Sequence, residues 1–145
     1  MKRLILTLAF VLAVVAAATP AFAQKAGGLR IEFQGPGGHS FGAYGRVSAL
    51  HAAARTVILL QKALPARSYQ ITNMTGGNSV NAIASDGLIE LRLTAGNAKA
   101  YEGLVAAVTK AAADGAAAEN AFRGVKAGDL TSGAPATVRS SVTRF

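Results

Sequence analysis

A glycine-rich segment near the start of the sequence holds the first residue whose type could do chemistry. It runs from Gly35 to Arg46 (GPGGHSFGAYGR) and carries His39 followed by Ser40. Glycine at this density lets the backbone turn tightly or lets another group approach it closely. A neutral imidazole can donate a hydrogen bond to a carbonyl oxygen. The segment therefore predicts a binding loop around His39.

A second glycine pair, Gly76 and Gly77, is followed by Asn81 and, further on, by Arg92. An amide side chain can donate and accept hydrogen bonds, and a guanidinium binds a carboxylate through two parallel hydrogen bonds. With His39, these residues have the chemistry of one half of a polar substrate site.

The sequence argues against a metal site within the chain. A catalytic zinc needs about three protein ligands that converge on one point. The chain has two histidines, seven acidic residues and no cysteine, and no H-E-x-x-H motif. The second histidine, His51, falls at the edge of the apolar face of a predicted helix, where a structural role is the usual one. We therefore expect no metal ligands here.

Other catalytic patterns are missing as well. There is no G-x-S-x-G motif to expose a nucleophilic serine, and a neighbouring His-Ser pair rarely has the geometry for proton transfer. The first glycine loop lacks the Lys-Ser/Thr of a phosphate-binding loop and the spacing of a dinucleotide fingerprint. The sequence alone indicates a loop that could hold an anion or a carbonyl oxygen.

The elements that must position these loops follow from hydrophobic periodicity. Alternating apolar and polar residues are typical of half-buried strands, and apolar residues three or four apart are typical of helices. Strands are predicted at 29–34, 66–77, 88–95 and, weakly, 120–128, and helices at 46–64 and 98–115. This β-α-β-β-α-β order predicts an α+β, ferredoxin-like fold: a four-stranded antiparallel sheet with two helices on one face.

The first 23 residues have the pattern of a secretory signal peptide. Lys2 and Arg3 precede an apolar run from Leu4 to Ala18, and an A-x-A cleavage motif ends at Ala23. We expect cleavage after Ala23, a secreted or periplasmic protein, and no membrane association after cleavage. The domain is then predicted at 24–128, followed by a loosely ordered tail at 129–145.

The 145-residue chain carries a net charge of +8, which favours anionic partners. Export argues against nucleic acid, and the predicted strands lack the aromatic pattern that stacks RNA bases. Without cysteine the domain has no disulfides, so packing or a partner must stabilise it.

Two stretches of the sequence resemble a known family. They are GPGGHSFGAYGRVSALHAAARTVILL and ITNMTGGNSVNAIASDGLIELRL. They are similar to the dimerisation domain, or lid, of the di-zinc peptidases and deacylases of metallopeptidase family twenty. That family includes aminoacylase, glutamate carboxypeptidase, succinyl-diaminopimelate desuccinylase and tripeptidase. The resemblance covers roughly residues 29 to 128. The residues that match the family pattern are Gly35, His39, Ser40, Gly76, Gly77, Asn81, Ile83 and Arg92.

The resemblance implies roles for these residues. His39 would cross a dimer interface and hold the substrate carbonyl oxygen at the partner's zinc pair. Asn81 and Arg92, with Gly76 and Gly77, would bind the carboxylate end of a peptide or acyl-amino acid substrate. In the family the lid itself dimerises through a helix and an edge strand, and the separate catalytic domain carries every zinc ligand.

The match also has departures. Glu90 stands where the family usually has the Asp of an Asp-x-Arg pattern, and Ser85-Asp86 replaces a proline-containing turn. The expected function is an exported, stand-alone dimerisation domain, non-catalytic alone, that associates with itself or completes a partner's active site. Two alternatives stay open: a fragment of a secreted zinc metallopeptidase, and a small periplasmic binding protein for peptides or amino acids that uses Asn81 and Arg92.

Overall fold

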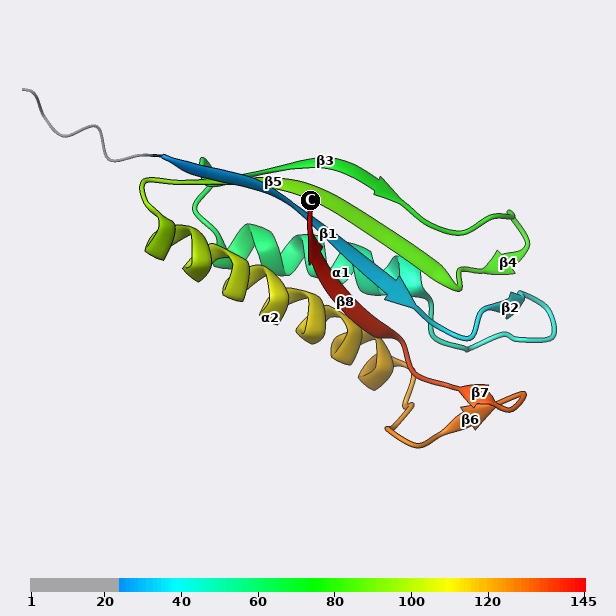
Figure 1. Ribbon diagram of the computed structural model, residues 1–145. Helices are drawn as coiled ribbons and strands as arrows, with labels where there is room; N and C mark the ends of the chain where they lie inside the picture. Colours follow the sequence, from blue (N-terminus) through cyan, green and yellow to red (C-terminus); the bar gives the residue numbers. More distant parts are fainter. Residues whose placement is uncertain (1–23) are drawn as a thin grey trace, which may run out of the picture.

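The computed structural model describes residues 24–145, so the predicted signal peptide lies outside the described residues. The fold has two layers, with one sheet lying over two helices (Figure 1). In chain order the elements are β1 (Lys25–Gln34), β2 (Gly38–His39), α1 (Ala49–Ala63), β3 (Tyr69–Thr75), β4 (Ala82–Ile83), β5 (Asp86–Ala95), α2 (Ala98–Phe122), β6 (Leu130–Thr131), β7 (Ala134–Pro135) and β8 (Arg139–Arg144).

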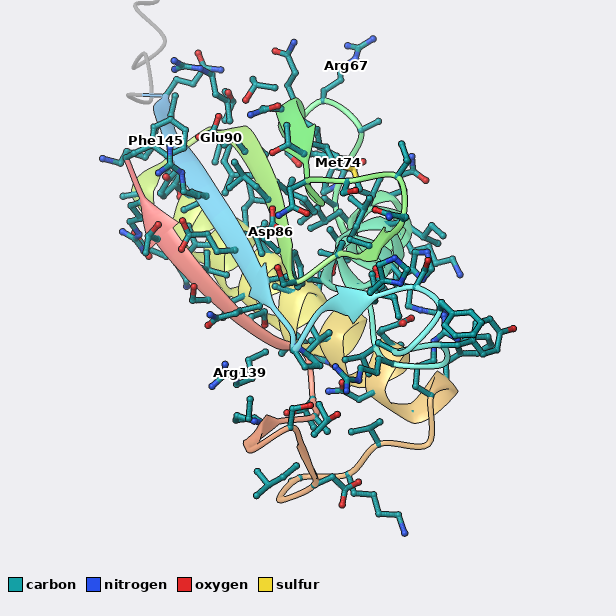
Figure 2. The ribbon with its side chains drawn as sticks, turned by 90° about the vertical axis from the view of Figure 1, so that its right-hand side faces the viewer. Arg67, Met74, Asp86, Glu90, Arg139 and Phe145 are labelled. Carbon is teal, nitrogen blue, oxygen red and sulfur yellow. The ribbon has the colours of Figure 1, made fainter. Side chains whose placement is uncertain are left out.

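The main sheet has four strands in the order β3-β5-β1-β8, and every neighbouring pair is antiparallel. Both helices cover the same face, so the other face is open, as the view in Figure 2 shows. The predicted α+β, ferredoxin-like architecture is therefore confirmed.

The alternation that predicted the two central strands also builds the core. Leu29, Ile31 and Phe33 of β1 point toward the helices and are buried, while Arg30 and Glu32 between them are exposed. Strand β5 repeats the pattern, with buried residues at Ile89, Leu91 and Leu93. Burying each of these large apolar side chains contributes about 1.5–3 kcal/mol, so the two central strands anchor the sheet to the helices.

The two helices approach each other closely because the residues between them are small. Gly115 of α2 faces Thr56 of α1, whose hydroxyl donates to the Ala52 carbonyl oxygen at 2.9 Å. Gly115, the last residue of the helix predicted at 98–115, thus serves a helix contact, and α2 continues beyond it to Phe122. Neither helix in the described part of the chain is long and apolar enough to cross a membrane.

The prediction of a fourth strand at 120–128 is wrong. The alanine-rich run before Phe122 has high helix propensity and extends α2 through the first part of that segment. The fourth strand is β8, which pairs with β1 and lies inside the segment that was expected to be a loosely ordered tail. Asn120 fixes its start: its amide nitrogen donates to the Val138 carbonyl at 3.0 Å, and its amide oxygen accepts from the Val138 N–H at 2.7 Å.

Candidate functional site

Two loops that are far apart in the sequence are joined at one end of the sheet. Strands β2 and β4 pair with each other, with His39 opposite Ala82. The Ser40 N–H donates to the Asn81 carbonyl oxygen at 2.9 Å. We call the resulting projection, made of residues 36–45 and 76–85, the tip; it carries β2 and β4 in Figure 1. Within the tip, the side chains of His39 and Asn81 meet, with Nε2 and Nδ2 3.3 Å apart.

The hydrogen bonds around His39 define which of its ring nitrogens can donate. The Phe41 backbone N–H donates to His39 Nδ1 at 3.3 Å, so a neutral ring carries its proton on Nε2. The Ser79 hydroxyl donates to the Asn81 amide oxygen, which leaves the Asn81 amide nitrogen toward the ring. With the ring proton on Nε2, this nitrogen and the Asn81 amide nitrogen 3.3 Å away are both donors, and an oxygen placed between them would accept from both. Paired donors of this kind can hold one carbonyl or carboxylate oxygen.

The glycines of the first loop are required by its shape. Gly37 has a φ of +62° and Gly38 a φ of +137°, which residues with a side chain rarely adopt. A Cβ on Gly38 would also lie 2.6 Å from the Ala43 methyl group. The Arg46 guanidinium donates to the Gly37 carbonyl oxygen at 3.1 Å and holds the loop against the start of α1. The loop thus presents His39 on a fixed backbone.

The second glycine pair shapes the turn between β3 and β4. A Cβ on Gly76 would lie 2.7 Å from the Asp86 carbonyl oxygen, and Gly77 has a φ of +73°. Both positions are therefore explained by backbone geometry. Their contact with substrate stays a prediction.

Arg92 is not brought to the other predicted site residues within one chain. It lies on the open face of β5, opposite Gly28 of β1 and Gln70 of β3. Strand β5 begins at Asp86, next to the tip, and six residues of strand span about 20 Å. One chain therefore assembles His39 and Asn81, but not the Asn81–Arg92 cradle that a peptide-binding protein would need.

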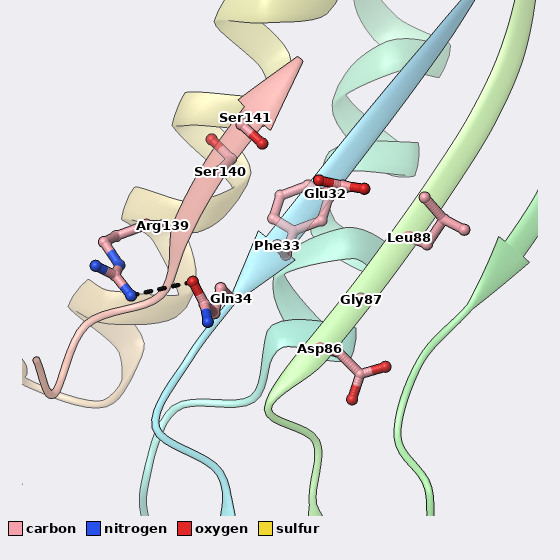
Figure 3. Close-up of a pocket in the computed structure, with 9 residues that line it drawn as sticks. All are labelled: Glu32, Phe33, Gln34, Asp86, Gly87, Leu88, Arg139, Ser140 and Ser141. Carbon is pink, nitrogen blue, oxygen red and sulfur yellow. Dashed lines mark hydrogen bonds between the residues drawn. The ribbon is translucent and has the colours of Figure 1, made fainter. Parts of the chain in front are cut away.

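A shallow cavity of about 580 Å³ lies on the open face near the tip end of the sheet (Figure 3). Its charged lining residues are Glu32, Asp86 and Arg139, and Arg139 donates to the Gln34 side-chain oxygen at 3.3 Å. Sequence reasoning missed Arg139 because it lies in the segment expected to be a tail. None of the predicted site residues lines this cavity.

A buried carboxylate supports the start of α1, directly after the first glycine loop. Glu119 of α2 is fully buried and accepts from the Ser48 backbone N–H at 3.1 Å, from Arg55 at 3.0 Å and from Arg123 at 3.3 Å. Burial alone raises the pKa of the Glu119 carboxyl. These three donors lower it more, so its pKa lies below its ordinary value. No local pattern indicates this cluster, because Ser48 and Arg55 are 71 and 64 residues from Glu119 in the chain and only Arg123, at the end of the same helix, is close to it.

The tip has no ligand set for a metal ion. His39 is accompanied by an amide and a hydroxyl residue, and neither is a usual zinc ligand. Across residues 24–145, no group of three or more histidine, cysteine, aspartate or glutamate side chains could hold a metal ion. The described residues therefore do not form a site for the zinc ions that the family named above binds.

Comparison with known proteins agrees with this architecture. The sequence profile of the peptidase dimerisation domain matches residues 24–123. No protein of curated function matches the sequence closely enough to count as a relative.

Several solved structures share the fold at low sequence identity. The aminobenzoyl-glutamate utilization protein from Klebsiella pneumoniae aligns with a TM-score of 0.65 at 16% identity, over 83% of this chain and 28% of its own. A tripeptidase from Staphylococcus aureus aligns with a TM-score of 0.61 at 14% identity, over 83% of this chain and 29% of its own. A dinuclear metal binding peptidase of the M20 family from Bacillus subtilis aligns with a TM-score of 0.56 at 16% identity, over 84% and 26%.

The chain thus spans less than a third of the length of each of these proteins. Such low identities establish the fold alone, whereas the sequence profile covers most of the described residues. On the strength of that match, the chain belongs to the peptidase dimerisation domain family of the M20 peptidases.

Proposed function

We propose that this protein is an exported dimerisation domain that has no catalytic activity alone and completes the active site of a partner. His39 and Asn81 would donate hydrogen bonds to one substrate oxygen held at the partner's catalytic centre. The observation that carries this proposal is the meeting of His39 Nε2 and Asn81 Nδ2, 3.3 Å apart, on a projecting tip. The partner would be a catalytic subunit of the same peptidase family, and self-association of the domain would bring two tips into one assembly.

The chemistry of the tip supports action in trans. Donors such as these stabilise the negative charge that develops on a carbonyl oxygen during acyl transfer. They do not supply a nucleophile or a general base, so the remaining groups must come from another surface. The substrate class that suits such a site is a peptide or an acyl-amino acid. Arg92, about 20 Å away along β5, would contact a carboxylate only in another part of the assembly.

Export is part of the same proposal. Cleavage after Ala23 would leave Gln24 as the first residue, one position before β1 begins. The intact mass of the protein recovered from the periplasm or medium tests this. A mass that retains the first 23 residues would contradict cleavage.

The proposed function can be tested by complementation. The probe is the tripeptidase from Staphylococcus aureus in which a short linker replaces its own dimerisation domain. Adding the full chain should raise tripeptide hydrolysis at least about tenfold, and His39→Ala should remove that gain, since losing one oxyanion donor costs about 100-fold or more in kcat. His51→Ala is the matched control and should retain the gain. Failure of the wild-type chain to raise hydrolysis would contradict the proposal.

A further inference from the structure

The most exposed large hydrophobic side chains of the described residues are gathered on the tip. Phe41 and Tyr44 are each 92% exposed, and Val80 is fully exposed. The other exposed large hydrophobic residues are between 39% and 68% exposed: Ile58, Met74, Phe122, Leu130 and Phe145. Phe41 and Tyr44 follow His39 in the first loop, and Val80 directly precedes Asn81 in the second. The apolar side chains thus lie on the same two loops as His39 and Asn81.

An ordered backbone holds these side chains in water. The Ala43 N–H donates to the His39 carbonyl oxygen at 2.8 Å, and the Arg46 N–H donates to the Ala43 carbonyl oxygen at 3.1 Å. The turn that carries Phe41 and Tyr44 is therefore closed by hydrogen bonds at both ends. Their exposure is a property of the folded loop, and apolar surface gathered in this way marks interaction sites.

The tip also lacks charge. The chain has 15 lysine and arginine residues and 7 acidic residues, but none of them lies in residues 36–45 or 76–85. The nearest cation, Arg46, directs its guanidinium to the Gly37 carbonyl and the Ser132 hydroxyl. Depletion of charge together with enrichment of aromatic residues is the composition of the buried centre of a protein interface.

The shape of the tip decides what kind of partner it suits. Small molecules bind in concave sites. The cavities of about 580, 560, 380 and 300 Å³ are lined by other parts of the chain, and neither His39, Asn81 nor the three apolar side chains lines any of them. A projecting, apolar surface suits a concave surface on another protein.

The area of the tip argues against a stable contact between two tips. An aromatic side chain buries about 150–250 Å², so Phe41 and Tyr44 together supply about 300–500 Å². A standard interface buries about 800 Å² on each partner. Two flat or convex tips facing each other would fall short of this, whereas a cleft that wraps around the tip buries additional surface of the domain.

We infer that Phe41, Tyr44 and Val80 anchor the tip in an apolar cleft of the catalytic partner and seal that cleft around His39 and Asn81. This inference rests on the proposed function and adds the residues that hold the two proteins together. Excluding water strengthens the hydrogen bonds that the donor pair makes to a substrate oxygen. This role explains why large apolar side chains lie on the same two loops as a polar pair.

The affinity of the full chain for the linker-bearing tripeptidase, measured by calorimetry, tests the inference. Phe41→Ser combined with Val80→Ser should weaken binding at least about 30-fold, since an interface anchor is worth tenfold or more. Ile58→Ser combined with Leu130→Ser is the matched control, because it replaces two exposed apolar side chains away from the tip. The control should bind within about threefold of the wild type. Thermal unfolding of each variant verifies that these exposed substitutions leave the fold intact.

The outcomes separate the inference from the proposed function. Wild-type binding that Phe41→Ser and Val80→Ser leave unchanged would overturn the anchor role and leave the proposed function standing. No binding by the wild-type chain would contradict both. If sedimentation shows that the wild type alone forms a dimer that these substitutions abolish, the tip binds a second copy and the inference is wrong. His39→Ala should bind normally and fail only in hydrolysis.

Discussion

Gly115→Ala is expected to lower the free energy of unfolding by about 2–3 kcal/mol, although alanine has the higher helix propensity. A Cβ at this position would lie 2.0 Å from the Thr56 hydroxyl oxygen and 3.0 Å from the Ala52 carbonyl oxygen and the Thr56 amide nitrogen. The hydroxyl is held by its own hydrogen bond, and the other two atoms are backbone. The helices would therefore have to move apart. Urea unfolding at neutral pH measures the loss.

Gly103 provides a control on the same helix. A Cβ there meets nothing within 4 Å, so Gly103→Ala should stabilise the protein by about 0.5–1 kcal/mol through helix propensity. Adding Thr56→Ala to Gly115→Ala removes the closest clash. The double variant should therefore lose less free energy of unfolding than the sum of the losses in the two single variants. Equal unfolding midpoints for Gly103→Ala and Gly115→Ala would contradict the close helix contact.

Glu119→Gln is expected to lower the free energy of unfolding at pH 7 by about 3 kcal/mol. Removing one partner of a buried charge cluster costs about 3–5 kcal/mol, and the lower end applies because Arg55 and Arg123 can still reach water. A glutamine keeps the size of the side chain but loses the charge that both guanidiniums bind. Glu102→Gln is the matched control on α2, because its pair with Arg144 is exposed to solvent and should contribute little to stability.

The effect of Glu119 should depend on pH with a defined sign. Its folded-state pKa lies below the ordinary value of 4.5, because the Ser48 N–H, Arg55 and Arg123 outweigh the effect of burial. The stability that Glu119 contributes is therefore fully present above pH 4.5 and is lost as the pH falls through the lowered value. The difference in the free energy of unfolding between the wild type and Glu119→Gln should therefore shrink as the pH is lowered. A difference that widens below pH 4.5 would contradict the arrangement.

The sequence could predict the parts of the fold that local patterns control. Alternation identified the central strands because their two faces differ, with the core on one side and solvent on the other. It failed for the fourth strand for two reasons. The alanine-rich segment before Phe122 favours a helix, and the pairing of β8 with β1 is a long-range contact that no local pattern indicates. It also ended the second helix too early, at Gly115, because only the contact with α1 shows why a glycine is needed inside α2.

The sequence predicted which residues make up the candidate site, but only partly which of them come together in the folded chain. The family resemblance named His39, Asn81 and Arg92 from their motifs. The meeting of His39 with Asn81 depends on two-residue strands, which carry no periodicity of their own. The separation of Arg92 follows from its register on β5. The clustering of Phe41 with Val80 needs the same loop pairing, so no local pattern indicates it.

The zinc content and tripeptide hydrolysis of the purified full chain alone test most directly whether His39 and Asn81 form only half of a site. The chain is equilibrated with zinc, dialysed and assayed without any partner. Our account predicts less than stoichiometric zinc and no turnover. At least one zinc ion per chain, together with turnover that His39→Ala abolishes, would contradict it.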